Sequence, residues 1–275
     1  MLEPSSSAPD TDRFTRLALN AARVLRRAFP AALRARIRRL MFRWFDLQSS
    51  LPSGLVVRVR SLGEWWLLNE IFVNGEYEAA LAHLLHDRPS GPGPVVIVDL
   101  GANLGYFTLQ AIDRLRRAGI RDVRVLAVEV DEECCRELER RMRENALTTC
   151  VELVRGAIGS RDGIGCFEDG DERYARRVVE SGHAASGPSV PYVDLMSYVG
   201  DVQAVDLLKC DVEGAELLFL RSYPELLRSV RTVVMELHPE LCDADECLRL
   251  LGEYGLARQT VLRAGDFGST VLAHR

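Results

Sequence analysis

Acidic residues stand just after an apolar run in the second half of the chain. Asp211 and Glu213 follow the run Val205–Cys210, in the segment KCDVEGAE that starts at Lys209. Lys209 is the only lysine of the chain, and it shares a side of the predicted strand with Asp211 because side chains alternate along a strand. A carboxylate next to an ammonium group can accept a proton or position a polar substrate. The alternative is a structural ion pair at the end of a strand.

A histidine follows the next apolar run, Val230–Leu237. His238 shares a side with Glu236, and an imidazole near neutral pH can act as a general base. The alternative is a histidine that only hydrogen-bonds its own loop. Elsewhere, His83 and His86 are three residues apart on a predicted helix, and two histidines without a third ligand do not predict a metal site.

A glycine-rich turn follows a third apolar run, Val95–Leu100, in the sequence VDLGANLG. Gly101 allows a sharp turn and a close approach of the backbone to a ligand. The free amides of the helix that follows favour a negative group. A dinucleotide-binding fingerprint needs G-x-G-x-x-G, but Asn103 and Tyr106 replace its second and third glycines, which disfavours NAD.

One more acid, Glu129, ends the apolar run that starts near Arg121. At the end of a second strand, such an acid can accept hydrogen bonds from both hydroxyls of a ribose. The alternative is a charged residue that meets water at the end of a strand.

These motifs need a framework in which several strands end at one edge. Apolar runs alternate with amphipathic helices, which predicts a mostly parallel seven-stranded α/β sheet with an antiparallel edge. We expect strands at 95–100, 121–129, 151–158, 205–210, 230–237, 257–263 and 269–273, and helices near 104–115, 131–146, 214–228 and 243–254. In the second helix, Asp131 is the predicted cap, and Glu137/Arg141 and Glu139/Arg143 are predicted to pair on the outside.

The chain is predicted to have three parts, divided at composition changes. Residues 1–12 are expected to be disordered, 13–92 to form basic helices and a small α/β extension with a strand at 55–60, and 93–275 to form the catalytic domain after the SGPGP segment. Residues 161–200 lack a clear period over most of their length and are expected to form a loop over the acceptor.

The basic segment 13–45 carries ten arginines and no acid, so with a net charge of −5 the rest of the chain carries −15. Its apolar stripes predict two helices broken at Pro30. We favour helices that pack on their own domain or on a partner subunit. Peripheral membrane contact is an alternative, whereas a nucleic-acid partner is disfavoured because the rest of the chain is strongly acidic.

Composition excludes several classes of protein. Hydrophobic residues make up 47% and charged residues 27%, which excludes a fully disordered, collagen-like or coiled-coil chain. No apolar run approaches the roughly 20 residues that span a bilayer, and the polar start lacks the core of a signal peptide, so a cytoplasmic location is expected. The seven cysteines contain no CxxC pair and are expected to be reduced thiols.

The segments VDLGANLGYFT, AVEVD, LLKCDVEGAE and VMELHPE together resemble the FkbM family of S-adenosylmethionine-dependent methyltransferases, over about residues 93–240. The resemblance implies a class I Rossmann-like fold and S-adenosylmethionine (SAM) as methyl donor. It also implies an acceptor hydroxyl on a natural product or sugar, as in bacterial secondary metabolism.

The resemblance further implies which residues bind the cofactor. It places Asp99, Gly101, Asn103 and Gly105 at the methionine part, with Ala102 in the same turn. It places Glu129 at the ribose, Val130 and Ala157 beside the adenine, and Tyr77 over the cofactor.

For catalysis we expect direct transfer of the methyl group to an oxygen, with Asp211 or His238 as the base and with Glu213 and Lys209 positioning the acceptor or tuning the base. Asp211, Glu213 and Glu236 could also supply oxygens to Mg²⁺, which is not favoured. The alternatives are methylation of nitrogen or carbon, and a non-catalytic binding protein that keeps the cofactor pocket. The acceptor is expected to be a small molecule, and a homo-oligomer is left open.

Overall fold

The computed structural model describes residues 47–87, 93–167, 178–180, 187–200, 204–265 and 268–275, in two compact units. The first unit, Met1–Trp66, contains an antiparallel hairpin of β1 (Leu47–Ser50) and β2 (Val56–Val59), which confirms the strand predicted at 55–60. The predicted disorder at 1–12, the basic helices at 13–45 and most of the SGPGP segment lie outside the described residues.

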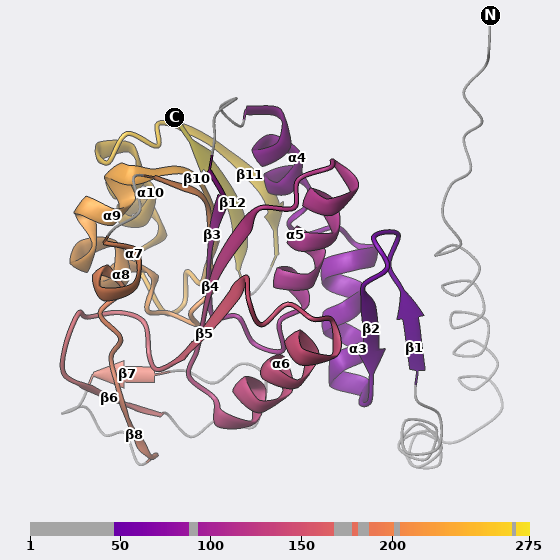
Figure 1. The fold of residues 1–275 in the computed structure, drawn as a ribbon. Helices are drawn as coiled ribbons and strands as arrows, with labels where there is room; N and C mark the ends of the chain where they lie inside the picture. Colours follow the sequence, from indigo (N-terminus) through magenta and orange to yellow (C-terminus); the bar gives the residue numbers. More distant parts are fainter. Residues whose placement is uncertain (1–46, 88–92, 168–177, 181–186, 201–203, 266–267) are drawn as a thin grey trace, which may run out of the picture. The chain divides into compact units, whose positions relative to one another are not determined.

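The second unit, Leu67–Arg275, is built on a seven-stranded sheet with the order β11-β12-β10-β9-β3-β4-β5 (Figure 1). The five strands β10, β9, β3, β4 and β5 run parallel to one another, and β12 is antiparallel to both β10 and β11, as predicted for the closing edge. The strands are β3 (Val95–Leu100), β4 (Val123–Glu129), β5 (Val151–Arg155), β9 (Val205–Cys210), β10 (Val230–Leu237), β11 (Arg258–Ala264) and β12 (Ser269–His274). Strand β3 is buried throughout, because a central parallel strand is covered on both faces.

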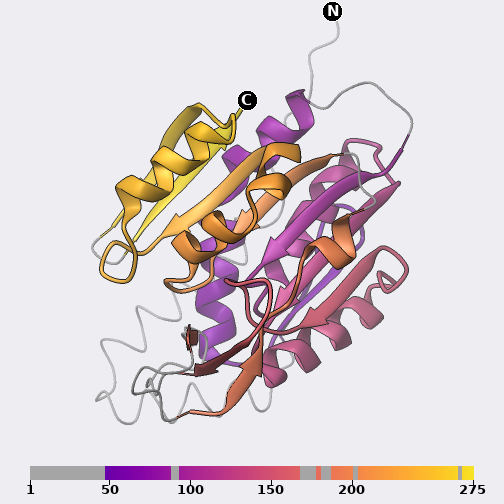
Figure 2. The same cartoon turned by 90° about the vertical axis from the view of Figure 1, so that its left-hand side faces the viewer.

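Helices cover both faces of this sheet (Figures 1 and 2). One face carries α4 (Glu78–Asp87), α5 (Tyr106–Arg117) and α6 (Glu132–Glu144). The other carries α7 (Met196–Val199), α8 (Glu216–Ser222), α9 (Pro224–Ser229) and α10 (Ala244–Glu253). The single helix predicted at 214–228 is interrupted at Tyr223, because Pro224 removes a backbone donor and starts a new helix.

The apolar block at 65–73 is helical: it comprises the end of α3 (Leu62–Leu68) and the π-helical turn η1 (Asn69–Val73). Because the second unit begins at Leu67 and includes α4, it starts earlier in the chain than the predicted division at 92/93. Leu81 and Leu84 of α4 are buried, so this helix belongs to the core of the larger unit.

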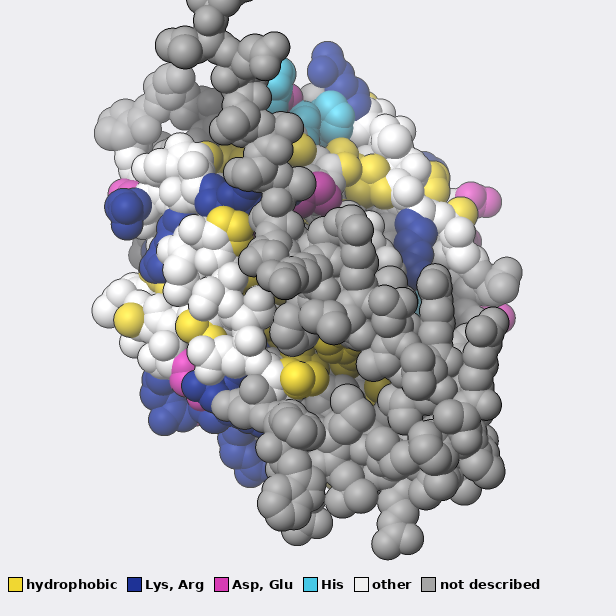
Figure 3. Space-filling view, turned by 90° about the vertical axis from the view of Figure 1, so that its right-hand side faces the viewer, with side chains coloured by type: hydrophobic (Ala, Val, Ile, Leu, Met, Phe, Trp, Pro, Cys, Tyr) yellow, Lys and Arg dark blue, Asp and Glu magenta, His cyan; other side chains and the backbone are white. Residues whose placement is uncertain are grey.

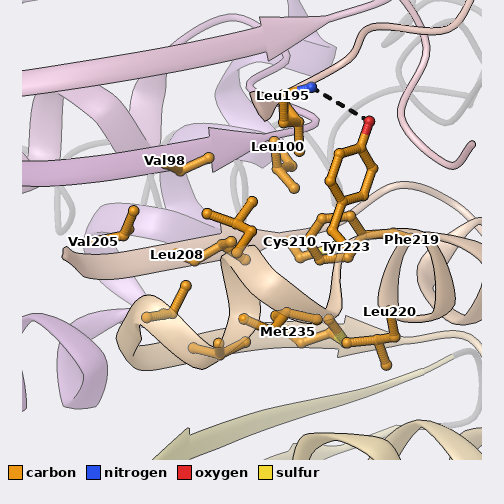
Figure 4. Packing of buried hydrophobic residues seen from close by; sticks show 14 of the residues in the cluster. Val98, Leu100, Leu195, Val205, Leu208, Cys210, Phe219, Leu220, Tyr223 and Met235 are labelled. Atoms are coloured by element: carbon orange, nitrogen blue, oxygen red, sulfur yellow. Dashed lines mark hydrogen bonds between the residues drawn. The ribbon is translucent and has the colours of Figure 1, made fainter. Parts of the chain in front are cut away.

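The core on the α8 face fixes the ends of the central strands. Figure 4 shows Phe219 and Tyr223 packed beside Leu100 and Cys210. The hydroxyl of Tyr223 donates to the carbonyl oxygen of Val193 at 2.7 Å. A buried aromatic ring with a satisfied hydroxyl packs tightly without leaving a lone polar group. The strand ends that carry the functional residues therefore rest on a rigid layer.

One side chain of helix α6 that was expected on the surface is buried. Asp131 caps it as predicted, accepting from the amides of Glu133 and Cys134 at 2.8 and 3.0 Å. Arg143 pairs with Glu139 on the outside at 3.4 Å, also as predicted. Arg141 does bond Glu137, at 3.2 Å, but the prediction that this pair lies outside is wrong, since the arginine side chain is 1% exposed.

Arg141 turns inward because the interior offers partners for its planar guanidinium. One nitrogen donates to the carbonyl oxygen of Leu104 at 2.6 Å, and the guanidinium lies 4.0 Å from the centroid of the Tyr106 ring. A sequence pattern of i,i+4 charges does not reveal such partners, which come from another element.

Residues 161–200 contain more regular structure than predicted. A three-stranded antiparallel sheet has the order β7-β6-β8, with β6 (Ile164–Phe167), β7 (Val178–Glu180) and β8 (Ser189–Pro191). These strands are too short to show a period in the sequence. All seven cysteines are free thiols, as predicted. Among the described residues, no helix has the length and hydropathy required to cross a bilayer.

Candidate active site

The motif residues meet at the carboxyl edge of the parallel strands. Strand order reverses between β3 and β9, and open α/β sheets bind ligands at such a reversal. The ends of β3, β4, β9 and β10 bring Gly101, Glu129, Asp211 and His238 to this edge. The sequence therefore predicted correctly which segments lie at the same edge.

The turn after β3 passes directly against the turn after β9. Gly101 has a φ of +69°, and a Cβ at this position would lie 1.8 Å from the backbone oxygen of Asp211. The amide of Asp211 in turn donates to the carbonyl oxygen of Leu100 at 3.1 Å. Only glycine fits at this point, where the turn after β3 crosses the turn after β9; we refer to it as the crossing. Asn103 also has a positive φ, +49°, which asparagine tolerates better than most residues.

A buried ion group supports the crossing from beneath. The ammonium of Lys209 donates to the carbonyl oxygen of Gly101 at 2.7 Å and lies 3.7 Å from Oδ1 of Asp99 and 3.5 Å from Oδ2 of Asp211. Burial lowers the pKa of Lys209, but the carboxylates of Asp211 and Asp99 outweigh this effect and raise it. The lysine is therefore a fixed cation that holds both turns together.

Asp99 lies below the turn and has no exposed surface. Its Oδ2 accepts a hydrogen bond from the hydroxyl of Thr108 at 2.7 Å. Burial raises the pKa of Asp99, which Lys209 and Thr108 oppose. The structure thus places Asp99 behind the binding turn rather than on its surface.

Glu129 is held almost entirely by backbone amides. Its Oε2 accepts from the amide of Asn103 at 2.7 Å, and its Oε1 accepts from the amides of Val130 and Asp131 at 2.9 and 2.8 Å. Burial raises the pKa of Glu129, and these three hydrogen bonds oppose that rise. A carboxylate has about four acceptor positions, so one remains for a ligand.

A first hollow with about 630 Å³ of empty space, open to solvent, lies over these groups. It is lined by residues from the ends of β3, β4, β5 and β9, among them Gly101, Asn103, Glu129, Val130, Ala157, Ile158, Asp211 and Glu213. Its walls combine carboxylates with apolar side chains, which suits a nucleoside.

A second hollow of about 430 Å³ shares Gly101, Asn103 and Asp211 with the first. Its other walls include Ala102, Tyr77, Glu76, Lys209 and Glu236. Burial raises the pKa of Glu236 to about 8, with Asp211 and Glu76 adding to the rise. The ring of Tyr77 lies 5.8 Å from the ammonium of Lys209 and packs edge-on against Phe107.

Glu213 stands at the wall of the first hollow in an unusual backbone conformation. Its φ is +51°, which is costly for a residue with a side chain. Burial raises its pKa to about 7, and the carboxylate of Asp211 adds to the rise. At neutral pH this carboxylate can therefore both accept and release a proton.

His238 is clamped between two glutamates. Its Nδ1 donates to Oε1 of the fully buried Glu216 at 2.8 Å, and its Nε2 lies 3.4 Å from Oε2 of Glu213. Burial lowers the pKa of His238, but the hydrogen bond to Glu216 and the charges of Glu216 and Glu213 outweigh this effect and raise it to about 9. His238 is therefore an imidazolium at neutral pH.

The protonated state of His238 bears on two sequence-based expectations. An imidazolium cannot accept a proton, so the geometry favours the carboxylates over His238 as the base. The metal-capable group at this edge consists of Asp211, Glu213 and His238, without the Glu236 considered for Mg²⁺. A metal ion bound here would have to displace the proton of His238, and the absence of a metal stays a prediction.

Most of the remaining predicted cofactor-binding residues line one of the two hollows, and Gly105 does not. Val130 and Ala157 line the first hollow, and Tyr77 and Ala102 line the second. Gly105 is instead the N-cap of α5, where a Cβ would lie 2.9 Å from the Leu138 side chain. Its role is thus to bring α5 and α6 together.

Sequence reasoning missed two acids of this region. Glu216 is the last residue of KCDVEGAE, and the sequence pattern assigns it no role, yet its carboxylate holds His238. Its spacing of three residues from Glu213 is the available signal. Glu76 accepts from the hydroxyl of Thr270 at 2.9 Å, and nothing in the sequence connects these two residues.

A model of the methyltransferase FkbM domain matches residues 99–261, more than half of the chain. The chain belongs to the FkbM methyltransferase family. It is therefore a SAM-dependent methyltransferase with the class I Rossmann-like fold, as the motifs indicated.

Solved structures with a similar fold are remote in sequence. The METTL16 MTase domain is 14% identical with a TM-score of 0.48, covering 82% of this chain and 85% of its own. Human methyltransferase 10 domain containing protein is 16% identical with a TM-score of 0.44, covering 74% and 80%. Methyltransferase FkbM from Methylobacillus flagellatus KT is 14% identical with a TM-score of 0.46, covering 66% and 44%. No curated protein matches the sequence.

The residues at the edge fit the cofactor of this FkbM-family enzyme. The crossing at Gly101 has no room for a Cβ beside the backbone of Asp211, and Glu129 keeps one acceptor position that suits a hydroxyl donor. Val130 and Ala157 offer an apolar wall for the adenine. Asp211, common to both hollows, provides negative charge for a cationic donor.

Proposed function

We propose that this FkbM-family enzyme transfers the methyl group of SAM to a hydroxyl oxygen of a small molecule, such as a natural product or a sugar. The observation that carries the proposal is Glu213, a carboxylate at the wall of the first hollow whose pKa lies at about 7. A hydroxyl must lose its proton as the C–O bond forms, so it needs a base of this strength at this place.

Bound SAM supplies a methyl group activated by a sulfonium. Gly101 would allow the cofactor to approach the backbone, Glu129 would accept from the ribose, and Val130 and Ala157 would contact the adenine. Tyr77 and Ala102 would hold the methionine part, because they line the hollow that shares Asp211 with the first.

On the acceptor side, the hydroxyl lies between Asp211 and Glu213. Glu213 accepts the hydrogen bond of its single O–H, which orients an oxygen lone pair, and takes that proton as the new bond forms, while Asp211 faces the cationic donor. Lys209 keeps Asp211 in place through the ion pair at 3.5 Å. His238 is a positioning residue: its imidazolium, anchored by Glu216, keeps Glu213 turned to the hollow.

Methylation of an amine is the second candidate. It is favoured by the carboxylates that line the second hollow, Glu70, Glu76, Asp211 and Glu236, since they would attract an ammonium. An ammonium must lose one proton before its nitrogen can attack, and it does so more readily than an alcohol loses its own proton. The small-molecule acceptor, the bacterial origin and the cytoplasmic location remain predictions.

The test is an acceptor screen with matched pairs of compounds that differ only in carrying a hydroxyl or an amine at one position. Incorporation of a labelled methyl group from SAM is followed by mass spectrometry. We expect turnover of hydroxyl compounds, and a loss of this turnover in Glu213→Gln. Turnover of the amine partners alone, unaffected by Glu213→Gln, would refute O-methylation.

A further inference from the structure

A second group of histidine and carboxylate side chains lies away from the active site. His83 and Asp87 are one turn apart at the end of α4, and His274 is the last residue of β12. Nε2 of His83 lies 3.4 Å from Oδ2 of Asp87, and the rings of His83 and His274 are 4.1 Å apart between centroids. One ligand atom from each of the three residues lies within 4.8 Å of the others. In the space-filling view, histidine side chains gather at the upper edge (Figure 3).

The hydrogen bonding of His274 indicates which of its ring nitrogens carries a lone pair. Nδ1 of His274 lies 3.1 Å from the carbonyl oxygen of Arg275. Because a carbonyl oxygen only accepts, Nδ1 carries the proton, and the lone pair of the neutral ring is on Nε2. Histidines that bind metals characteristically donate their other ring N–H in this way.

Asp87 supplies the negative charge of the group and remains open to solvent, with its side chain 49% exposed. Its Oδ1 is contacted by Nδ1 of His86, which fixes the carboxylate with Oδ2 toward His83. An ion could therefore enter from solvent without moving the core.

The group lies at the opposite end of the sheet from the active site. His274 pairs with Thr232, near the start of β10, whereas His238 follows the end of that strand. Six residues of extended chain correspond to about 20 Å. Whatever binds at His274 therefore does not contact the methyl donor.

We propose that His83, Asp87 and His274 bind one divalent transition-metal ion such as Zn²⁺, which ties the end of α4 to the end of β12. Two imidazoles and a carboxylate form a ligand set that suits Zn²⁺, with water in the fourth position. Since no bond to the reacting groups is involved, the ion would stabilise the fold rather than take part in methyl transfer.

The test uses the full chain, freed of metal by a chelator, and titrates it with Zn²⁺ by calorimetry and with Co²⁺ by absorption. We expect one ion per chain with a dissociation constant of about micromolar, and a Co²⁺ spectrum without the thiolate charge-transfer band that the free cysteines would give. His83→Ala and His274→Ala should each weaken binding at least about tenfold. The matched control, His238→Ala, removes a histidine outside the group and should change affinity less than about threefold.

A thermal unfolding series separates this site from the active-site group. Saturating Zn²⁺ should raise the Tm of the wild type and of His238→Ala by several degrees, because a ligand that binds only the folded state stabilises it. It should not raise the Tm of His274→Ala. Unchanged Zn²⁺ affinity in both His83→Ala and His274→Ala, loss of binding in His238→Ala, or no binding in the wild type would each overturn the proposal.

Discussion

The two halves of the sheet edge hold their carboxylates in different ways. On the β4 half, Glu129 is fixed by three backbone amides, and Asp131 is fixed as a helix cap. On the β9–β10 half, Glu213 and His238 are held by each other and by Glu216. The first arrangement makes a rigid acceptor for a neutral partner such as a ribose. The second makes groups whose protonation depends on their neighbours, which is what proton transfer needs.

Gly101 and Glu213 both have a positive φ, but the energetic cost of this conformation differs between them. Gly101 adopts a left-handed conformation at little cost, whereas Glu213 adopts one at a cost of about 1–3 kcal/mol. Such a conformation persists only where the surrounding structure enforces it. Asn103 and Ala146 also have a positive φ, so the strain at Glu213 accompanies its assignment as the base and does not carry that assignment.

The largest expected effect is at the crossing of the two halves. In Gly101→Ala the new methyl group would collide with the backbone of Asp211, so we expect loss of measurable SAM binding and a free energy of unfolding lower by about 3 kcal/mol or more. Gly119→Ala is the matched control, since it also has a positive φ but nothing within 4 Å of the added carbon. Calorimetry and urea unfolding compare the two, and equal behaviour would refute the crossing as the cause.

Next in size is the loss of the base in the β9–β10 half. Glu213→Gln keeps the shape but cannot take a proton, so kcat should fall about 10²- to 10⁴-fold. In the wild type, kcat/KM should rise as pH increases through about 7, because Glu213 must be ionised to accept a proton. A steady-state pH profile with an acceptor from the screen should lose this step in the variant. A step that persists would assign the base elsewhere.

The β4 half should be sensitive to the arginine beneath its binding turn. Arg141→Ala removes the hydrogen bond to Leu104 and the contact with Tyr106, and we expect a loss of about 2–4 kcal/mol in the free energy of unfolding. Arg143→Ala, on the same helix, removes only an exposed ion pair and should cost less than about 0.5 kcal/mol. Urea unfolding measures both, and similar values would show that burial of Arg141 contributes nothing.

Protonation of His238 should appear in the stability of the protein. The pKa of His238 is raised in the folded state from 6.5 to about 9, so its contribution is fully present below pH 6.5 and is lost as pH rises through about 9. We expect the free energy of unfolding to fall by about 2–3 kcal/mol over this range. His238→Gln should abolish most of that fall in urea titrations.

His238→Gln also tests the assigned positioning role through a catalytic readout. Because the charge of His238 lowers the pKa of Glu213, its removal should move the midpoint of the pH–rate profile above 7. A purely structural histidine would leave this midpoint unchanged.

The sequence allowed prediction of the strands of the large sheet, its mostly parallel arrangement and the residues at the strand ends, because a parallel sheet leaves continuous apolar runs that end in polar residues. It did not allow prediction of where polar side chains point once another element approaches. Arg141 was assigned to the surface because its partners, Leu104 and Tyr106, lie on a different helix and turn.

Two further features could not be predicted from the sequence for the same physical reason: the protonation of His238, and the group formed by His83, Asp87 and His274. The pKa of His238 depends on Glu216, whose buried position comes from the start of α8 rather than from a motif. His83 and His274 are brought together only because β12 closes the sheet next to β10, on which α4 also packs. Local patterns predict elements, whereas contacts between distant elements decide charge state and ligand sets.

The central claim is that the β4 half binds the cofactor and the β9–β10 half handles the proton. Calorimetric titration of SAM into the wild type, Glu129→Ala and Glu213→Gln tests it without any acceptor. We predict that Glu129→Ala weakens SAM binding by about tenfold or more, since a hydrogen bond to a charged group contributes about 1.5–3 kcal/mol, and that Glu213→Gln changes it by less than about threefold. Unchanged binding in Glu129→Ala together with a large loss in Glu213→Gln would contradict this division.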